Sequence, residues 1–432
     1  MSSLITFAAG EAGEEVQKTV ATENEWESLK ERLATYNATW NNGEWSTAVT
    51  NTMVHTALQG NGHVGVHSDG NYSVFSQEKT YRISKDDFWD WRTTNHISVG
   101  GVTLATPETS KISFSGCGEH SYKTVFSNVW DKSMSSEWVC TCSTEGKHHI
   151  IIDLGKSFEL SKYVIQHSSG SMNRSFTVSV STDGTNYETV ETVTDNTLQA
   201  TEFIFDAAKS VRYFRVDITG PNKNDATVRI FEIELFDKQG RQLNSKDNIN
   251  IREELNIVDG VLTNDMDFDD VPVTINNWVS ATEDVMITEM KNNGGIAVAL
   301  ESELFTRSDY DYFPLEAGVN EDGSVWVSKT SSNPDEGKNQ NSWTSKIVLM
   351  SKILGVESTA MKNSDGKSAT LGFTIPAGET VYLITSVGGG GKTYDWQGLP
   401  MGVDPSKEAK EILTKVNSKE DINELKLLND EW

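Results

Sequence analysis

The sequence predicts an all-β protein with short helices at its N- and C-terminal ends. Between residues 45 and 387, short runs of alternating apolar and polar residues are separated by Gly, Asn, Asp and Ser turns, as expected of half-buried strands. Near both ends of the chain, residues with high helix propensity predominate instead. The chain has 432 residues, too many for one ordinary core, so we expect two or three domains.

Composition narrows the classes of partner. Hydrophobic residues make up 36% and charged residues 23%, which suits a soluble globular protein. The longest apolar runs are too short to span a bilayer, so we expect no membrane insertion. A net charge of -26 repels phosphate backbones, so we expect no nucleic-acid partner. The opening "MSSLITFAAGEAGEE" is not a signal peptide as it stands, although a chain trimmed of its signal would look the same.

The first elements follow from local texture. Residues 13–36 are rich in helix formers and predict one helix or two short ones within an N-terminal segment, 1–44. A first β block covers about 45–106, where "SDGN" between alternating runs predicts a hairpin. A second covers about 115–236, with strands such as "HHIIIDLG", "SFTVSVSTDG" and "VRIFEIELF". A polar stretch, 237–248, predicts a linker before the third β block.

That third block, 255–387, leads into two C-terminal helices. Asp404 is a predicted N-cap with Pro405 at the first helical position. Ser418 and Asp421 have the spacing of a capping box. One face of the second helix carries Ile422, Leu425, Leu428 and Trp432. This stripe fits either a chain that continues beyond Trp432 or a helix that docks on its own sandwich.

Familiar catalytic signatures do not fit. "VGGGGKTY" resembles a phosphate loop, but Ser386 stands where the first glycine belongs, and no helix follows. Among 63 acidic residues, nothing selects an acid–base pair for glycoside chemistry, so we predict no catalytic residue. In "QGNGHVG", Asn61 or His63 is a possible substrate contact, with a tight turn as the plainer interpretation.

The three cysteines leave the redox state open. Cys140 and Cys142 flank one residue, so on a strand both would point to the same face. Either could bridge to Cys117, and one thiol would remain over. A zinc site is not expected, because no suitably spaced histidine accompanies the three cysteines.

The stretch "NVWDKSMSSEWVC", 128–140, places one acid among hydroxyl residues before an aromatic. Calcium takes six to eight oxygen ligands, and a tight polar turn supplies several. Asp131 offers a carboxylate, Ser133 a carbonyl and Ser136 a hydroxyl, but a second carboxylate would have to come from elsewhere. Taken alone, the stretch therefore favours a polar turn over a calcium site.

Together with "HHIIIDLG", "KYVIQHSS", "SFTVSVSTDGTNYETV" and "VRIFEIELF", this stretch resembles the discoidin, or coagulation-factor 5/8 type C, family, and within it carbohydrate-binding module family 32. The resemblance implies a galactose-binding-like jelly roll over about 111–240. It also implies a structural Ca²⁺ held by Asn128, Asp131, Ser133, Ser136, Phe231 and Glu232. Lys132 stands where the family has a glycine, which forfeits backbone freedom and adds a positive charge.

The same resemblance implies a sugar site at loops on one end of the sandwich. The residues at matching positions are His167, Asn173, Arg174, Asn222 and Asn224. The loop "GPNKNDATVR" lacks the aromatic that the family often carries there. Glycans of the galactose or fucose type are the expected partners, and a framework domain without a working site is the alternative.

The flanking blocks resemble the N-terminal β-sandwich of bacterial glycoside hydrolases with an (α/α)6 barrel, near family 95. "TALQGNGHVGV", "HISVGGVTL" and "FTIPAGETVYLITSV" carry this second resemblance. It implies a large discontinuous sandwich, 45–110 and 250–400, split by the inserted module and followed by linker helices, 401–432. The catalytic barrel of that family would lie downstream and is missing from this chain.

We therefore expect carbohydrate binding by a non-catalytic portion of a bacterial glycoside hydrolase that is secreted or displayed at the cell surface. One alternative is an adhesion protein whose discoidin-like module binds protein or glycan. Another is a glycosidase that is active by itself. Turnover of aryl glycosides by the purified chain would favour the last alternative.

Overall fold

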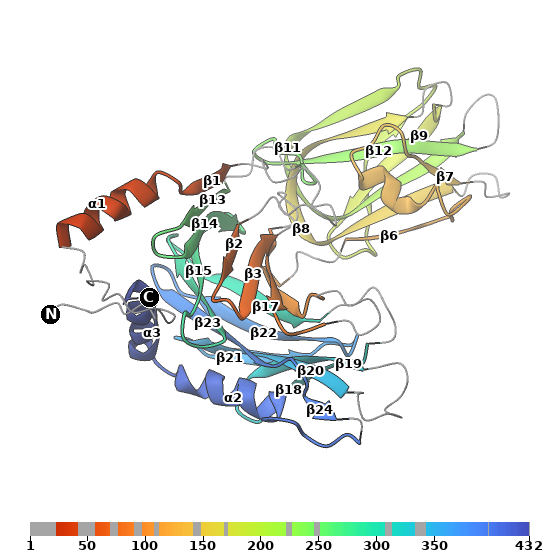
Figure 1. The fold of residues 1–432 in the computed structure, drawn as a ribbon. Coiled ribbons are helices and arrows are strands. Elements are labelled where there is room, and N and C mark those ends of the chain that lie inside the picture. Colours follow the sequence, from red (N-terminus) through yellow and green to blue (C-terminus); the bar gives the residue numbers. More distant parts are fainter. Residues whose placement is uncertain are drawn as a thin grey trace, which may run out of the picture. The chain divides into compact units, whose positions relative to one another are not determined.

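The structure is a computed structural model. It describes residues 23–41, 57–69, 77–89, 97–107, 112–140, 148–167, 172–221, 227–245, 251–306, 313–332, 343–395 and 397–431. The chain forms two compact units. The large unit comprises 1–70, 79–104 and 250–432, and the middle unit comprises 71–78 and 105–249 (Figure 1). The middle unit therefore interrupts the large unit in the sequence.

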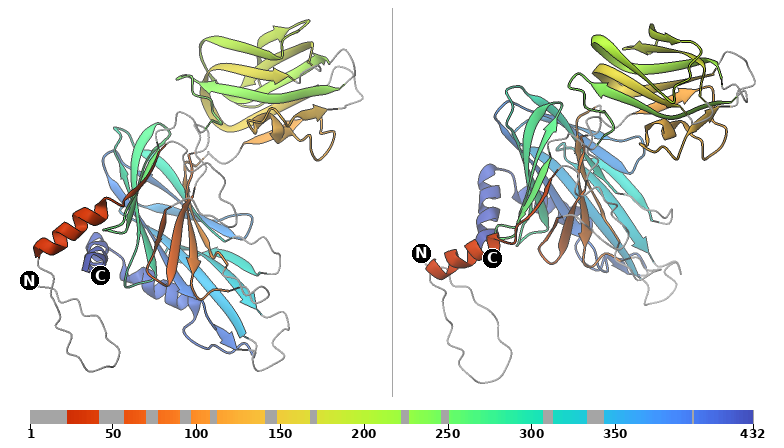
Figure 2. Two further views of the ribbon diagram at one scale, coloured as in Figure 1. Left: turned by 45° about the horizontal axis from the view of Figure 1, so that its top comes forward. Right: turned by 90° about the horizontal axis from the view of Figure 1, so that it is seen from above.

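The large unit contains two antiparallel sheets (Figure 2). The first runs, in spatial order, β1 (Ala38–Asn41), β13 (Arg252–Asn256), β14 (Val261–Phe268), β15 (Val271–Val279), β16 (Val285–Asn292), β23 (Thr380–Gly389), β20 (Trp343–Leu354), β19 (Val325–Ser332) and β18 (Leu315–Val319), with β24 (Tyr394–Asp395) paired to β20. The second runs β2 (Leu58–Gly60), β3 (Val64–Asp69), β4 (Lys79–Lys85), β5 (Gly100–Ala105), β17 (Val298–Phe305), β22 (Ser368–Ile375) and β21 (Ser358–Lys362).

Hydrogen bonds between polar side chains link these two sheets. The Nζ of Lys79, on β4, donates to Glu253, on β13, and both side chains are buried, at 0% and 1% exposure. Ser68 Oγ donates to the same carboxylate at 2.8 Å. Asn264 Nδ2 donates to the Tyr81 hydroxyl at 3.1 Å. The interior of the large unit therefore holds a buried ion pair together with other hydrogen-bonded polar side chains.

Three α-helices lie in the described part of the chain: α1 (Glu23–Ala34), α2 (Pro405–Lys415) and α3 (Lys419–Glu431). The predicted N-cap is confirmed, because the Asp404 carboxylate accepts from the backbone N–H groups of Ser406 and Lys407. The capping box is also confirmed: Asp421 N–H donates to Ser418 Oγ at 3.1 Å, and Ser418 N–H donates to Asp421 Oδ2 at 2.9 Å.

Only part of the apolar stripe of α3 packs against the core. Ile422 is buried and Leu425 packs against the same core as α2, whereas Leu428 lies at the surface. Trp432 is outside the described residues. Gly388, near the end of β23, has a packing role, because a Cβ there would lie 2.4 Å from Pro405 O and 2.5 Å from Ala409 N. Glycine is required there so that α2 can approach the sheet.

The middle unit is a small sandwich built on two long strands. Its sheet runs β10 (Glu188–Val193), β9 (Ser175–Ser181), β11 (Ala200–Gly220), β8 (His148–His167), β12 (Val228–Asp237) and β7 (Trp138–Cys140), with β6 (Ser113–Gly116) paired to β8. Register shifts in the pairing of β8 with β11 let one half of β8 pair with β6 and the other half with β12. A short 3-10 helix, η1 (Phe126–Trp130), precedes the acidic turn.

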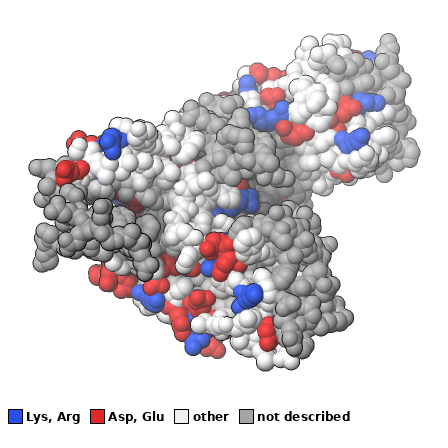
Figure 3. All heavy atoms as spheres, in the orientation of Figure 1, with Lys and Arg blue, Asp and Glu red and all other residues white. Residues whose placement is uncertain are grey.

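The prediction of an all-β fold with sandwich and jelly-roll sheets is confirmed. Of the predicted N-terminal helix, α1 lies inside the described residues and 13–22 lies outside them. No described helix is long and apolar enough to cross a membrane. On the face that Figure 3 shows, acidic side chains gather over the C-terminal helices of the large unit, whereas on the middle unit both signs are mixed.

Candidate functional site

The acidic turn after η1 is fixed by its own side chains. Ser133 N–H donates to Asp131 Oδ1 at 2.8 Å, and the Ser136 hydroxyl donates to Asp131 Oδ2 at 2.6 Å. Asn128 Nδ2 donates to the carbonyls of Lys123 and Glu137 at 2.8 and 2.9 Å, which links the chain before the turn to the chain after it. The turn thus gathers four of the predicted ligand residues: Asn128, Asp131, Ser133 and Ser136.

A second carboxylate, that of Glu232 on β12, lies beside this turn. Glu232, next to Phe231, is only 3% exposed. Its Oε2 accepts from Lys132 N–H at 3.0 Å, and its Oε1 accepts from Asn244 Nδ2 at 3.4 Å. Burial, and then the nearby Asp131 carboxylate, raise the pKa of Glu232 to about 8.

These residues fit a hard cation. Two carboxylates converge, one of them is buried, and their mutual repulsion is what a divalent cation relieves. The Lys132 ammonium does not take that place in this structure: its Nζ donates to Ser245 Oγ at 3.4 Å. The donor set is oxygen-rich, which suits Ca²⁺ rather than a softer metal.

Lys132 adopts the backbone conformation that the missing glycine would favour. Its φ is +61°, in the left-handed region, and this conformation turns its N–H toward Glu232. A Cβ in that region costs roughly 1–2 kcal/mol. The departure from the family pattern therefore keeps the geometry of the turn at a cost in stability.

We expect Lys132→Gly to be more stable than Lys132→Ala by about 1 kcal/mol, measured by urea unfolding of the full chain. Both variants lose the contact with Ser245, so the difference isolates the backbone term. Equal stability of the two variants would contradict the assignment of strain to this position.

The turn is anchored to the core by Trp138. Its Nε1 donates to Gly118 O at 3.0 Å, and its ring stacks on Phe126 with centroids 5.6 Å apart. Trp138 is fully buried. The aromatic that follows the acidic stretch in the sequence thus holds η1 and the turn in place.

The predicted sugar loop divides into buried and exposed residues. His167 and Asn173 are 2% and 0% exposed. Asn173 Nδ2 donates to Arg229 O at 2.9 Å and lies 3.4 Å from His167 Nδ1, while His167 Nε2 lies 3.1 Å from Thr201 Oγ1. Burial lowers the pKa of His167 to about 4, so the ring is neutral at pH 7. Both side chains were expected to contact sugar, but in the structure they have partners inside the protein.

Arg174 is the exposed member of this group. Its NH2 nitrogen is 2.6 Å from Asp195 Oδ1, and the side chains of Arg174 and Asp195 are 46% and 82% exposed. The Arg174 backbone is held on both sides: its N–H donates to Gly220 O at 2.8 Å, and its carbonyl accepts from Asn196 N–H at 2.7 Å. Arg174 is therefore a donor with a fixed backbone at the surface. Asn222 and Asn224 lie outside the described residues.

The turn that faces Arg174 was not predicted from the sequence. Asp195 has a φ of +51°, and Leu198, three residues on, is 60% exposed. Asn196 Nδ2 ties this turn to the sugar loop by donating to Asn173 O at 3.1 Å. The "TDNT" turn signal was present in the sequence, but nothing there indicated that it would lie beside residue 174.

Strand register places these groups at one end of the middle unit, here called the Arg174 end. Gly220 pairs with Ser175, and Ile218 pairs with both Phe176 and His148. Ile230, near the start of β12, pairs with His167. The opposite end carries Asp153, which pairs with Tyr213.

Asn61, in the large unit, has an internal role. Its Nδ2 donates to Ser280 O at 3.0 Å, and its Oδ1 accepts from the N–H groups of His63 and Val64 at 2.9 and 2.8 Å. These contacts build the tight turn that was the plainer interpretation of "QGNGHVG". His63 is exposed, 3.8 Å from Asp284.

Comparison with known families bears on the middle unit. Residues 110–233 match the family model described as "F5/8 type C domain". This segment is an F5/8 type C domain. The match begins just before β6 and ends on β12, so it includes both the acidic turn and Glu232. The predicted relationship to the discoidin family is confirmed.

Several solved structures are similar to this chain. One is chitosan-binding module 2, in complex with chitotriose, of a chitosanase/glucanase from Paenibacillus sp. IK-5, at 19% identity over 29% of this chain and 94% of that chain, with a TM-score of 0.26. Another is CpGH89CBM32-5 from Clostridium perfringens, in complex with GalNAc-β-1,3-galactose, at 16% identity over 29% and 94%, with a TM-score of 0.26.

A longer neighbour is the family 89 glycoside hydrolase from Clostridium perfringens, at 21% identity and a TM-score of 0.26. The likeness covers 32% of this chain and 15% of that enzyme.

Proposed function

We propose that the F5/8 type C domain of this chain binds a carbohydrate at its Arg174 end, as the non-catalytic part of a secreted bacterial glycoside hydrolase. The observation that carries this proposal is the exposed Arg174–Asp195 pair, held by backbone bonds on both sides. A guanidinium and a carboxylate supply the planar donors and acceptors that sugar hydroxyls need. Leu198, in the same turn, offers exposed apolar surface for the C–H side of a ring.

His167 and Asn173 act in this proposal as positioning residues. Asn173 holds the Asp195 turn through Asn196, and it is itself held by the Arg229 carbonyl. Both side chains are buried, so they are not placed to contact the ligand. Their role in this proposal is to hold the backbone next to Arg174 in position. Glycans of the galactose or fucose type remain the proposed ligands, with a single-site Kd of about 0.1–1 mM.

We also propose that Asp131 and Glu232 hold a structural Ca²⁺. The support is the fit described above: two converging carboxylates, one of them buried, in a turn already closed by its serine hydroxyls. When bound, the ion supplies charge compensation and ties the turn after η1 to β12, near the two ends of the domain. Secretion is supported by the Cys117–Cys140 disulfide, since such bonds persist mainly in oxidising compartments.

Arg174→Ala should abolish retention on a glycan array without changing the melting temperature by more than about 1 °C, because the ion pair it breaks is exposed. The matched control is Arg212→Ala, a similarly exposed arginine paired with Asp153 at the opposite end of the sheets. Full binding by Arg174→Ala would show that this loop is not the site, whereas loss in both variants would indicate non-specific attraction. Aryl glycosides added to the same protein should not be turned over.

A further inference from the structure

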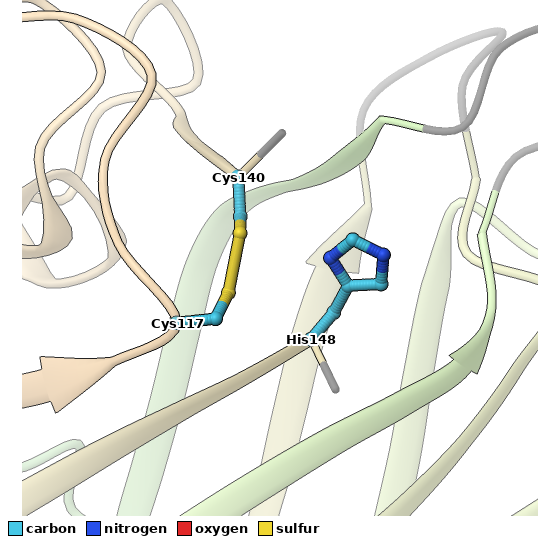
Figure 4. Close-up of side chains that lie close together, drawn as sticks. All are labelled: Cys117, Cys140 and His148. Atoms are coloured by element: carbon cyan, nitrogen blue, oxygen red, sulfur yellow. A yellow bond between two sulfur atoms is a disulfide. The ribbon is translucent and has the colours of Figure 1, made fainter. Parts of the chain in front are cut away.

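Three elements bring two cysteines and a histidine together near the Arg174 end of the middle unit (Figure 4). Cys117 follows β6, Cys140 ends β7 and His148 begins β8. Cys117 and Cys140 form a disulfide with Cα atoms 6.8 Å apart. The two sulfurs and one ring nitrogen of His148 all lie within 4.8 Å of one another. Residue Cys142, the other candidate for a bridge, is outside the described residues.

His148 carries a buried ring nitrogen for which the described part of the chain supplies no hydrogen-bond partner. The side chain is 4% exposed, and its Nδ1 has no hydrogen-bond partner among the described residues. Figure 4 shows this nitrogen on the side of the ring that faces the two sulfurs. Leaving a buried polar atom unsatisfied costs about 1–3 kcal/mol. The Nδ1 of a neutral imidazole offers a lone pair, which a metal cation can accept.

We propose that, once the disulfide is reduced, the Cys117 and Cys140 thiolates and His148 Nδ1 bind one Zn²⁺-type cation, with the fourth position open to water. Zinc lies about 2.3 Å from sulfur and about 2.0–2.1 Å from nitrogen, which sets tetrahedral ligands roughly 3.5–3.8 Å apart. Ligand atoms already within 4.8 Å reach that spacing by shifts on the order of 1 Å. Thiolates with one imidazole favour zinc over the calcium proposed for the acidic turn.

The disulfide form and the metal-bound form of the site are related by reduction of the disulfide followed by metal binding. A dithiol reductant gives two electrons and two protons to the Cys117–Cys140 bond and becomes a cyclic disulfide, leaving two thiols. Binding of Zn²⁺ then displaces the two thiol protons. The same side chains therefore make a covalent link in an oxidising compartment and a metal site in a reducing one.

Cobalt titration of the full-length chain tests this site. In a Cys142→Ser background, the protein is reduced with a dithiol, freed of reductant without oxygen, and titrated with Co²⁺. We expect one equivalent per chain with thiolate-to-cobalt charge-transfer absorption, which Zn²⁺ removes by displacing the cobalt. The oxidised protein should take up no cobalt with that signature. His148→Gln should bind at least about tenfold more weakly, since even lost outer contacts weaken metal sites 10–100-fold.

The control is His149→Gln, because adjacent strand residues point to opposite faces and His149 is not one of the clustered ligands. Circular dichroism follows the fold of each sample. The proposal is overturned if the reduced chain shows no charge-transfer band. Equal binding by His148→Gln and His149→Gln would also overturn it, as would a reduced chain that unfolds and is not refolded by cobalt.

Discussion

Removing calcium should lower the melting temperature of the middle unit by roughly 5–10 °C, and Glu232→Gln should eliminate that response. Calcium at one hundred times its Kd stabilises the folded state by about 2.7 kcal/mol. For a unit of this size, 1 kcal/mol moves the melting temperature by about 2–4 °C. Calorimetry in calcium and in chelator measures the shift. Glu234→Gln, which removes a more exposed carboxylate two residues along the same strand, should keep the full response.

The same carboxylate should make stability depend on pH when calcium is absent. Folded Glu232 keeps its proton up to a pKa of about 8, whereas an unfolded glutamate loses it near pH 4. The folded state thus binds more protons between these values, so the free energy of unfolding falls as pH rises through this window, by at most about 1.4 kcal/mol per pH unit. Glu232→Gln should remove that decline.

A wild-type chain that melts identically in chelator and in calcium would contradict the calcium site. A pH profile that is the same in Glu232→Gln and in the wild type would contradict the assignment of the raised pKa to this carboxylate. Both measurements use the full chain, and the transition of the middle unit is followed separately because the two units need not unfold together.

Glu253→Leu should destabilise the large unit by about 3–5 kcal/mol, because it removes the carboxylate that compensates the charge of the buried Lys79 ammonium. The double change Lys79→Met with Glu253→Leu should recover most of that loss, since an apolar pair of similar size needs no charge compensation. Urea unfolding measures both. Burial lowers the pKa of Lys79, whereas the Glu253 carboxylate acts in the opposite direction.

The control for this pair is Glu283→Gln. Glu283 forms an exposed ion pair with Lys415 at 2.7 Å, so its loss should cost less than about 1 kcal/mol. The account of the buried pair is contradicted if Glu253→Leu costs no more than this control. It is contradicted equally if the double variant is as unstable as the single one.

Features encoded by neighbouring residues were predictable from the sequence. Asp404 and the Ser418–Asp421 pair cap helices through contacts three residues away or fewer, so spacing alone predicts them. The acidic turn was also readable, because the serines that bond Asp131 lie within five residues of it. Its second carboxylate, Glu232, came from the family resemblance, and the structure brings it to the turn.

Contacts between residues that lie far apart in the sequence were not predictable. Lys79 and Glu253 are 174 residues apart, and neither stands out locally as a buried charge. The sequence indicated that His167, Asn173 and Arg174 share a loop region, but not that the first two are buried, because loop residues lack the strand alternation from which burial is inferred. Asp195 joins Arg174 from a turn 21 residues away.

Hydrogen exchange on the full chain tests the central claim most directly. It would be measured in calcium, with and without the glycan that the array retains. The account predicts that the sugar slows amide exchange in residues 172–175 and 195–199 at the Arg174 end, and leaves the turn at 181–187, at the opposite end, unchanged. Protection confined to 181–187 or to the large unit, or an array on which no glycan is retained, would contradict it.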